Sequence, residues 1–398
     1  MNRRVRIGIA GMGAAGQAFI APLRCHAGFD WVAMADPVSA VCDSMQREHA
    51  VTAYASLGEM LGQAGLDAVY VATPTPLHAE QVQQAAAAAK HVLVEKPMAT
   101  TLAQARAMVA AAERAGVVLL VGHSHSYDAP IARMRELIDS GELGRVRMVN
   151  TWCFSDWMQR PRRADELDSE QGGGVTFRQG AHQFDVIRLL CGGLASSVRA
   201  KTFDWNPQRR AIGAHSVFID FADGPAATAI YNGYGGLSSM DLCFDISEWG
   251  LHQPADRRPR RAAGMSATQE LQAKQARARS AIPAQAPYQP FFGLTVVSCE
   301  GGDIRQSPTG LLVHSEAGVR EIDVPRGRSP RDLVLAEFHD AIAGRAPALR
   351  DGRWGLANLE VCVAAIESSR IGQEVRLHEQ VAMSQRPAGA GLPAIGAA

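Results

Sequence analysis

The stretch Val5-Arg-Ile-Gly-Ile-Ala10 runs directly into Gly11-Met-Gly13-Ala-Ala-Gly16, and this junction decides the fold of the first part of the chain. The first six residues form an apolar run of strand length, and the helical stretch Ala14–Arg24 follows. Asp36 ends the next apolar run, twenty residues after Gly16. A G-x-G-x-x-G string between a strand and a helix, with an acidic residue at this spacing, predicts a dinucleotide-binding βαβ unit.

Each residue of this motif has a distinct physical task. Gly11 permits a tight turn, Gly13 lets the backbone approach a pyrophosphate, and Gly16 lets the helix pack closely on the strand. The helix N-terminus offers N–H groups to the phosphates. Asp36 would accept hydrogen bonds from the ribose hydroxyls and repel a 2′-phosphate, which favours NAD over NADP. The residues expected to hold NAD here are Gly11, Met12, Gly13, Ala14, Ala15, Gly16 and Asp36.

The first 125 residues alternate buried strands with helices, which predicts a doubly wound parallel sheet. The expected strands are Val5–Ala10, Trp31–Ala35, Asp67–Ala72, His91–Val94 and Val117–Val121. The expected helices are Ala14–Arg24, Ser39–His49, Leu77–Ala89 and Leu102–Ala115. The fold class is therefore α/β, with an N-terminal Rossmann domain over residues 1–125.

The pattern changes after residue 125, and a second, α+β domain with an open, mostly antiparallel sheet is expected over residues 126–378. Its expected strands are Val146–Phe154, Val198–Trp205, Ser216–Phe221, Ala226–Tyr231, Thr295–Ser298, Leu311–His314 and Arg320–Val324. Its expected helices are Asp128–Ser140, Gln179–Leu190, Arg331–Ala343 and Arg353–Ser369.

Two segments look irregular. Residues 251–290 carry seven Lys and Arg against two Asp and Glu. They are expected to form a flexible basic insertion, either solvated or a helical hairpin; an active-site lid or a subunit contact is the alternative. Residues 379–398 are rich in Ala, Gly and Pro and are expected to be a disordered tail.

Composition excludes several classes of protein. The 398 residues hold 40 basic and 40 acidic side chains, so no global field attracts nucleic acid, although the basic segment 257–279 leaves DNA binding as a remote alternative. No apolar run reaches the roughly 18 residues that cross a bilayer. Seven single cysteines without C-x-x-C pairs predict reduced thiols in a cytoplasmic protein and neither a disulfide framework nor a metal site.

A second motif, Glu95-Lys96-Pro97, follows the strand His91–Val94. Carboxyl ends of strands in a doubly wound sheet face the ligand crevice. Proline fixes its own φ and restricts the residue before it, so the side chain of Lys96 leaves in a defined direction.

At this point the sequence resembles the glucose–fructose oxidoreductase/inositol dehydrogenase (Gfo/Idh/MocA) family. The matching strings span residues 5–377. They are Gly8-Ile-Ala-Gly11-Met-Gly13, Ala35-Asp36-Pro37, Ala72-Thr-Pro74, Leu77-His78, Glu95-Lys96-Pro97, Gly141-Glu-Leu-Gly144, Gly172-Gly-Gly174, Gly180-Ala-His182-Gln-Phe-Asp185 and Ser368-Ser-Arg-Ile-Gly372.

The resemblance implies a catalytic pair, Lys96 and His182. Oxidation of an alcohol removes a proton from oxygen and a hydride from carbon. The ammonium of Lys96 would stabilise the developing alkoxide, and the imidazole of His182, with an ordinary pKa of about 6.5, would take the proton. Asp185, one turn along the same helix face, would orient His182. Thr73 and Pro74 are expected beside the nicotinamide, at the end of the strand Asp67–Ala72. Glu95 and Lys96 are also expected to contact the cofactor, while His78 is either a site residue or a packing residue.

One departure from the family pattern points to an anionic substrate. Members that oxidise sugars or inositols commonly carry Asp four residues before the catalytic histidine, where this chain has Arg178. An arginine there suits a carboxylate. The surrounding strings resemble a narrower subgroup, the phthalate 4,5-cis-dihydrodiol dehydrogenases. The further candidates for substrate binding are Arg160, Arg162, Arg163, Tyr127 and His123.

The sequence therefore predicts an NAD-dependent dehydrogenase that oxidises a carboxylated aromatic cis-dihydrodiol to a dihydroxy acid. The alternatives are a sugar, inositol or sugar-acid dehydrogenase of the same family and, remotely, a nicotinamide-sensing protein without turnover. The resemblance implies subunit contacts through the open sheet, hence a homodimer or homotetramer. No nucleic-acid, membrane or metal partner is expected.

Overall fold

The computed structural model describes residues 3–63, 65–253, 265–281 and 286–383. The chain divides into two compact units: Met1–His123 with Arg331–Leu359, and Ser124–Pro330 with Glu360–Ala398. The segment 331–359, which the sequence placed with the second domain, therefore packs with the first. Helix α11 (Gly352–Ile371) contains the point of division.

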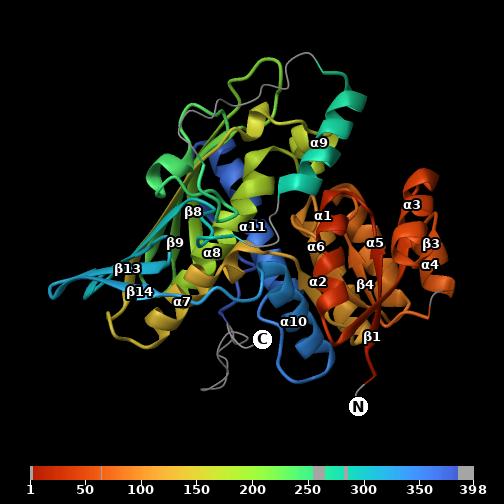
Figure 1. The fold of residues 1–398 in the computed structure, drawn as a ribbon. Helices are drawn as coiled ribbons and strands as arrows, with labels where there is room; N and C mark the ends of the chain where they lie inside the picture. Colours follow the sequence, from red (N-terminus) through yellow and green to blue (C-terminus); the bar gives the residue numbers. More distant parts are fainter. Residues whose placement is uncertain (1–2, 64, 254–264, 282–285, 384–398) are drawn as a thin grey trace. The chain divides into compact units, whose positions relative to one another are not determined.

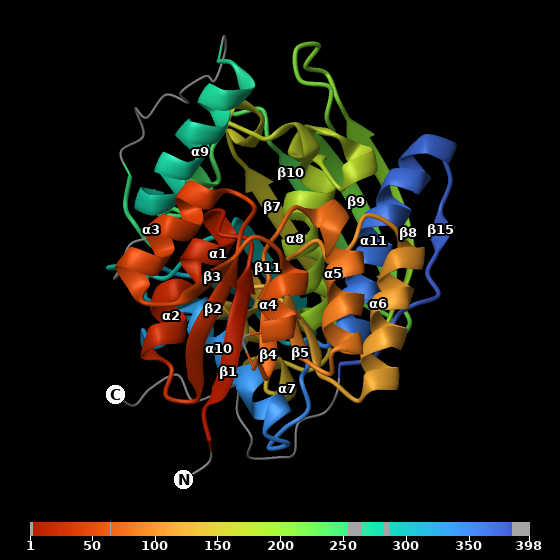
Figure 2. The same ribbon diagram turned by 90° about the vertical axis from the view of Figure 1, so that its right-hand side faces the viewer.

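The first unit is a Rossmann domain around one parallel sheet of order β3-β2-β1-β4-β5-β6. Its strands are β1 (Val5–Ala10), β2 (Phe29–Ala35), β3 (Thr52–Tyr54), β4 (Ala68–Val71), β5 (His91–Val94) and β6 (Leu119–Val121). Its helices before residue 124 are α1 (Ala14–Ala18), α2 (Ile20–Cys25), α3 (Ser39–His49), α4 (Leu57–Gln63), α5 (Thr75–Ala87) and α6 (Leu102–Ala115). Helices α5 and α6 lie side by side (Figure 2). Strand β4 is buried along its whole length, as expected of a sheet covered on both faces.

The expectation of one helix over Ala14–Arg24 is wrong, because the chain breaks into α1 and α2 at Phe19. Pro22 has no N–H, so it suits the first turn of a new helix better than the interior of a long one. The ring of Phe19 packs on Tyr70, with ring centroids 4.5 Å apart. The short elements β3 and α4 were not predicted.

The segment 331–359 extends the sheet beyond β6. The N–H of Val121 donates to the carbonyl of Arg350 (3.0 Å), and Leu120 bridges to Asp351. Helix α10 (Pro330–Ile342) brings Phe338 against Phe29, with ring centroids 6.0 Å apart. These contacts explain why the segment belongs with the first unit.

The second unit contains a nine-stranded, mostly antiparallel sheet of order β14-β13-β12-β11-β7-β10-β9-β8-β15 (Figure 1). The strands are β7 (Val146–Phe154), β8 (Ala195–Phe203), β9 (Ala214–Phe221), β10 (Ala226–Asn232), β11 (Leu294–Cys299), β12 (Gly302–Gln306), β13 (Gly310–Ser315), β14 (Gly318–Asp323) and β15 (Val375–Arg376). Only the pair β7 and β10 is parallel among the pairs described. Strands β12 and β15 were not predicted.

The helices of the second unit are α7 (Ala129–Asp139), α8 (Ala181–Cys191) and α9 (Ala267–Ala281). Helix α8 packs against β7 and β10. Short 3₁₀ turns occur at His125–Tyr127, Trp157–Gln159, Ala164–Leu167, Ser169–Gln171 and Ser239–Leu242. The expected helix Gln179–Leu190 begins at Ala181, because a π-helical turn, Thr176–Gly180, precedes it. None of the described helices combines the length and apolarity that crossing a bilayer requires.

Two expected irregular segments are partly anchored. Helix α9 lies inside the expected flexible insertion 251–290, and its side chains pair with the rest of the second unit as described below; residues 254–264 and 282–285 lie outside the described residues. In the expected tail, the N–H groups of Glu379 and Met383 donate to Glu360 Oε2 and to the carbonyl of Gly192 (both 2.9 Å). Disorder is therefore wrong for residues 379–383, while 384–398 lie outside the described residues.

We predict that Arg350→Met destabilises the first unit by about 3–5 kcal/mol, because it leaves the carboxylate of Glu337 buried without its cation. The two side chains are 1% and 2% exposed and join at 3.0 Å. Urea unfolding measures the change. The exposed pair of Arg345 and Asp340 supplies the control, because Arg345→Met should cost less than about 1 kcal/mol. Equal, small losses of unfolding free energy in both variants would contradict a stabilising role for the buried ion pair of Arg350 and Glu337.

Candidate functional site

The glycine turn of the first unit has the shape that a dinucleotide requires. Gly11 has φ of +90°, and an added Cβ would lie 2.8 Å from the carbonyl oxygen of Ala72. At Gly16 an added Cβ would lie 2.1 Å from the carbonyl oxygen of Gly11, so helix α1 packs on the turn only because this residue is glycine. At Gly13, the N-cap of α1, an added Cβ would meet nothing within 4 Å. The turn therefore leaves open space at the helix N-terminus, where a pyrophosphate fits.

Asp36 is tied to this turn as well as being available to a ribose. Its Oδ2 accepts the N–H of Met12 (3.0 Å), and its Oδ1 accepts the N–H of Val38 (3.0 Å). A carboxylate has about four lone-pair sites, so both oxygens can accept further hydrogen bonds. The ribose role of Asp36 stays a prediction, and its bonds to the glycine turn were not expected from the sequence.

The turn Glu95-Lys96-Pro97 is fixed by two buried side chains. Tyr70, inside the sheet, donates its hydroxyl to Glu95 Oε1 (2.6 Å), and burial followed by the charge of Glu95 raises the pKa of Tyr70 well above its usual value. His78 is buried between two carbonyl oxygens, that of Thr73 (2.8 Å) and that of Pro97 (3.1 Å). His78 therefore joins the ends of β4 and β5 on either side of Lys96, which is half-buried.

Other residues of this edge also have local partners. The hydroxyl of Thr73 donates to Gln81 (2.6 Å), and Pro74 is the N-cap of α5. His123 belongs to the first unit, where its Nε2 lies 3.4 Å from the amide nitrogen of Asn358. The other proposed substrate residues of the sequence analysis belong to the second unit.

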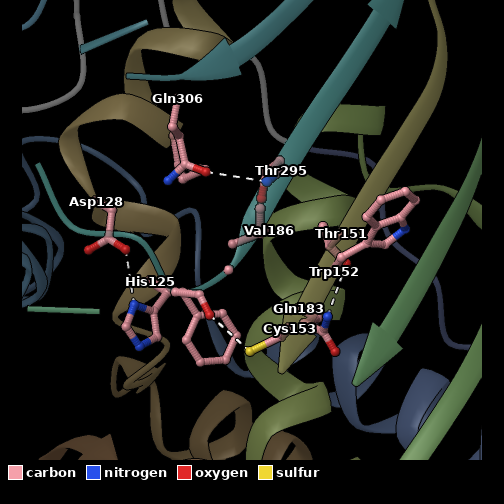
Figure 3. A pocket seen from close by; sticks show the side chains of 12 residues that line it. His125, Asp128, Thr151, Trp152, Cys153, Gln183, Val186, Thr295 and Gln306 are labelled. Atoms are coloured by element: carbon pink, nitrogen blue, oxygen red, sulfur yellow. Dashed lines mark hydrogen bonds and ion pairs between the residues drawn. The ribbon is translucent and has the colours of Figure 1, made fainter. Parts of the chain in front are cut away.

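Helix α8 is held to the sheet of the second unit by Gln183. The amide nitrogen of Gln183 donates to Thr151 Oγ1 (3.2 Å) on β7, as Figure 3 shows, and to the carbonyl of Ile230 (3.1 Å) on β10. Its amide oxygen accepts from His215 (3.0 Å), whose other nitrogen accepts from Thr176 (3.1 Å). Burial lowers the pKa of His215 to about 3, so this ring is neutral and suits both bonds.

His182 therefore lies on a helix that is anchored at the next residue, Gln183. It is 5% exposed, and its ring lies edge to face with that of His125, with centroids 4.6 Å apart. Phe292 packs beside both rings. Asp185 is buried one turn along α8, and Tyr127 is buried in the turn His125–Tyr127.

Arg178 lies in the π-helical turn before α8. The four residues from Arg178 to His182 therefore include part of a π turn, whose repeat is longer than the 3.6 residues of an α-helix. Single π turns inside α-helices occur frequently at functional sites. The guanidinium of Arg178 is mostly buried and pairs with Asp165 Oδ2 (3.3 Å).

The arginine run upstream also pairs with carboxylates of its own unit. Arg160 pairs with Asp156 (2.5 Å) and Arg163 with Asp165 (2.8 Å). Arg162 lies 4.0 Å over the ring of Trp157, and its Nη1 is 3.7 Å from Glu166 Oε1. The run is therefore part of a mostly buried charge network and not a solvated surface patch.

Helix α9 completes this network. Glu270 accepts from the guanidinium of Arg209 (2.5 Å) and from the backbone N–H of Arg162 (2.7 Å), and Lys274 pairs with Glu166. Burial lowers the pKa of Lys274 to about 8, and the charges of Lys274 and Arg162 outweigh burial to hold the pKa of Glu166 well below its usual range. Cations outnumber carboxylates among the paired members: Arg160, Arg162, Arg163, Arg178, Arg209 and Lys274 face Asp156, Asp165, Glu166 and Glu270.

Several of these residues escaped the sequence analysis. Glu270 and Lys274 meet partners about a hundred positions away, for which a single sequence carries no signal. His125 and Asp128 stand three residues apart, a spacing that brings side chains together in a helical turn and that was available as a signal. Within the described residues, no group of three or more His, Cys, Asp or Glu side chains is arranged to hold a metal ion.

A Rossmann domain with an open glycine turn, joined to an α+β unit with a buried histidine, defines an NAD-dependent oxidoreductase. The description "Oxidoreductase family, NAD-binding Rossmann fold" matches residues 5–123, and the "GFO/IDH/MocA C-terminal domain" matches residues 131–235. The chain belongs to the GFO/IDH/MocA oxidoreductase family, and NAD is its cofactor.

Relatives support this assignment. The 1-carboxy-3-chloro-3,4-dihydroxycyclohexa-1,5-diene dehydrogenase of Comamonas testosteroni is 36% identical over 379 residues, which cover 92% of this chain and 95% of that protein. A solved structure from Bordetella bronchiseptica RB50, described as a dehydrogenase, is 38% identical with a TM-score of 0.87, covering 94% of this chain and 100% of that one. The WlbA dehydrogenase of Bordetella pertussis, solved with NADH and UDP-GlcNAcA, shares the fold at 20% identity and a TM-score of 0.71, covering 95% of this chain and 99% of that one.

We predict that Asp36→Ala raises the NAD dissociation constant about 10–100-fold, since a hydrogen bond to a charged group contributes about 1.5–3 kcal/mol. The NADP constant should change less, because the variant also loses the repulsion of the 2′-phosphate. Calorimetric titration with both nucleotides measures the change, and Asp43→Ala, which removes an exposed carboxylate of α3, is the control. An equal rise of the NAD and NADP dissociation constants would contradict a ribose contact. Asp36 would then act only through its hydrogen bonds from Met12 and Val38.

We also predict that Glu270→Ala loosens α9, because it removes the acceptor shared by Arg209 and the backbone of Arg162. Tryptic cleavage after Lys274 should accelerate about tenfold, which corresponds to about 1.4 kcal/mol of local opening free energy. Gln272→Ala, at an exposed position of the same helix, should leave the rate unchanged. The same rate in all three proteins would show that Glu270 does not anchor the helix.

Proposed function

We propose that this oxidoreductase uses NAD to oxidise a carboxylated cyclohexadiene cis-diol, with phthalate 4,5-cis-dihydrodiol as the foremost substrate and 4,5-dihydroxyphthalate as product. The observation that carries the proposal is the mostly buried cluster of arginines around Arg178, which lies four residues before His182. A guanidinium can pair with a substrate carboxylate in a bidentate manner, which a neutral polyol cannot offer.

The relative from Comamonas testosteroni supports the same substrate class, since its name describes a dihydroxycyclohexadiene that carries a carboxy group. The similarity covers nearly the whole of both chains, the second unit included. A sugar-acid dehydrogenase is the alternative, because a sugar acid also presents a carboxylate beside a carbinol.

The chain's own residues divide the reaction between them. Gly11, Gly13 and Gly16 admit the cofactor's pyrophosphate, and Asp36 selects its ribose. The ammonium of Lys96 stabilises negative charge on the carbinol oxygen. His182 accepts the hydroxyl proton at its imidazole. When bound, NAD supplies the hydride acceptor.

Arg178 is proposed to hold the substrate's carboxylate, with Arg160, Arg162 and Arg163 as further candidates to hold a second carboxylate. Clamping the carboxylate fixes which C–H bond faces the cofactor. Loss of hydride and proton leaves a hydroxy-ketone that tautomerises to a catechol. Because aromaticity is gained, the reaction runs towards NADH.

The exposed apolar side chains of the sheet and the free cysteines support proposals for the oligomeric state and the cellular compartment. Met148, Trp152 and Phe218 expose large apolar side chains on strands β7 and β9 of the open sheet, which supports a homodimer or homotetramer built on this face. All seven cysteines are free, which supports a reducing cytoplasm.

The test compares kcat and KM for NADH formation with phthalate cis-4,5-dihydrodiol, benzene cis-dihydrodiol and myo-inositol. Arg178→Met should raise KM for the dicarboxylate diol about 10–100-fold, as expected for a lost charge-assisted bond, and leave the uncarboxylated diol unchanged. Asp165→Asn is the matched control, because it removes the internal partner of Arg178 and should leave KM unchanged or lower it.

A parallel loss in Arg178→Met and Asp165→Asn, on carboxylated and uncarboxylated diols alike, would mean that the ion pair only maintains the fold. Turnover of myo-inositol alone would contradict the proposed substrate class and would make the chain a polyol dehydrogenase of the family.

A further inference from the structure

A second buried histidine lies beside His182, and no role has been assigned to it above. His125 is 7% exposed and follows strand β6 in the turn His125–Tyr127. Its ring stands nearly perpendicular to that of His182, at 80°, with the centroids 4.6 Å apart. The two imidazoles come from different elements of the second unit, a 3₁₀ turn and helix α8. Their contact is therefore a product of tertiary packing.

The hydrogen bonding of His125 fixes which nitrogen carries the proton. Nδ1 lies 2.9 Å from Asp128 Oδ2, and Asp128 is 2% exposed at the N-cap of α7 (Figure 3). An ionised carboxylate only accepts hydrogen bonds, so Nδ1 holds the hydrogen and donates it. In the neutral ring, Nε2 is then an acceptor.

The plane of the ring is fixed as well. Phe292 stacks on His125, with centroids 4.2 Å apart and planes 24° apart, and also touches the ring of His182 edge-on at 5.3 Å. Trp249 lies 6.4 Å away on another side. Because Asp128 and Phe292 set both the tautomer and the ring orientation, Nε2 presents its lone pair in one direction.

We propose that His125 binds the second hydroxyl of the vicinal diol whose first hydroxyl gives its proton to His182. The inference rests on the proposed function and assigns a binding residue to the hydroxyl of its cis-diol that is not oxidised. Nε2 of His125 accepts a hydrogen bond from the hydroxyl that is not oxidised, and no bond to this hydroxyl is broken. Two adjacent imidazoles thus meet two adjacent hydroxyl groups, one as base and one as binding group.

Such a pair discriminates between a diol and a mono-alcohol. A mono-alcohol would leave Nε2 of His125 buried with its hydrogen bond unmade, and an unmade bond of this kind costs about 1–3 kcal/mol. The free enzyme meets this cost with water, which the diol displaces. A diol is therefore expected to exceed the matched mono-alcohol in kcat/KM by about 10–100-fold.

The experiment measures kcat/KM of the full chain with NAD for two substrates: phthalate cis-4,5-dihydrodiol and the dicarboxylated cyclohexadienol that lacks the second hydroxyl. His125→Phe keeps an aromatic ring against Phe292 and removes the acceptor. It should lower kcat/KM for the diol at least tenfold more than for the mono-alcohol, so that the preference disappears. Asp128→Asn should reduce the preference partially, since the amide no longer imposes one tautomer.

His314→Phe is the matched control, because His314 is an exposed histidine on β13 and should leave both substrates unchanged. The NAD dissociation constant of each variant reports that it is folded. Equal loss on both substrates in His125→Phe would overturn the inference, because His125 would then serve only the packing of His182. A wild-type enzyme that oxidises both substrates equally would overturn it while the proposed function stands, whereas turnover of neither would remove the proposed function itself.

Discussion

The hydrogen bonds of one buried amide, Gln183, decide where His182 stands. Gln183 joins helix α8 to strands β7 and β10 and accepts from His215. Because His182 directly precedes Gln183, the same hydrogen bonds also place the ring of His182. This ring packs against the rings of His125 and Phe292. His215, which burial keeps neutral, also forms a hydrogen bond with Thr176. Thr176 begins the π turn that contains Arg178, so this turn is anchored to the same group of side chains.

Charge compensation is the second organising constraint. Buried arginines would be costly alone, and Arg160, Arg162, Arg163 and Arg178 each have a carboxylate beside them. Helix α9 contributes Glu270 and Lys274 to this balance from the segment expected to be a loose basic insertion. A substrate carboxylate would thus enter a network that is already ordered, so little side-chain entropy is lost on binding.

The sequence alone predicted the Rossmann unit well, because glycines and buried strands carry local signals. Gly11, Gly13, Gly16 and Asp36 could be recognised as one motif from spacing alone. The π turn could not, since no residue pattern separates Thr176–Gly180 from an α-helical start. Nor could the pairing of Lys274 with Glu166, which depends on packing between distant segments. The contact of His125 with His182 could not be predicted either, because it depends on the packing of a 3₁₀ turn against helix α8.

The central claim is that NAD-linked oxidation of a carboxylated cis-diol yields a catechol. Its most direct test is to incubate the purified chain with NAD and phthalate cis-4,5-dihydrodiol and to measure NADH and product together. The account predicts one NADH for each diol consumed, and 4,5-dihydroxyphthalate as the product identified by mass spectrometry. Recovery of unchanged diol, from a chain that reduces NAD with a sugar acid or an inositol, would contradict it.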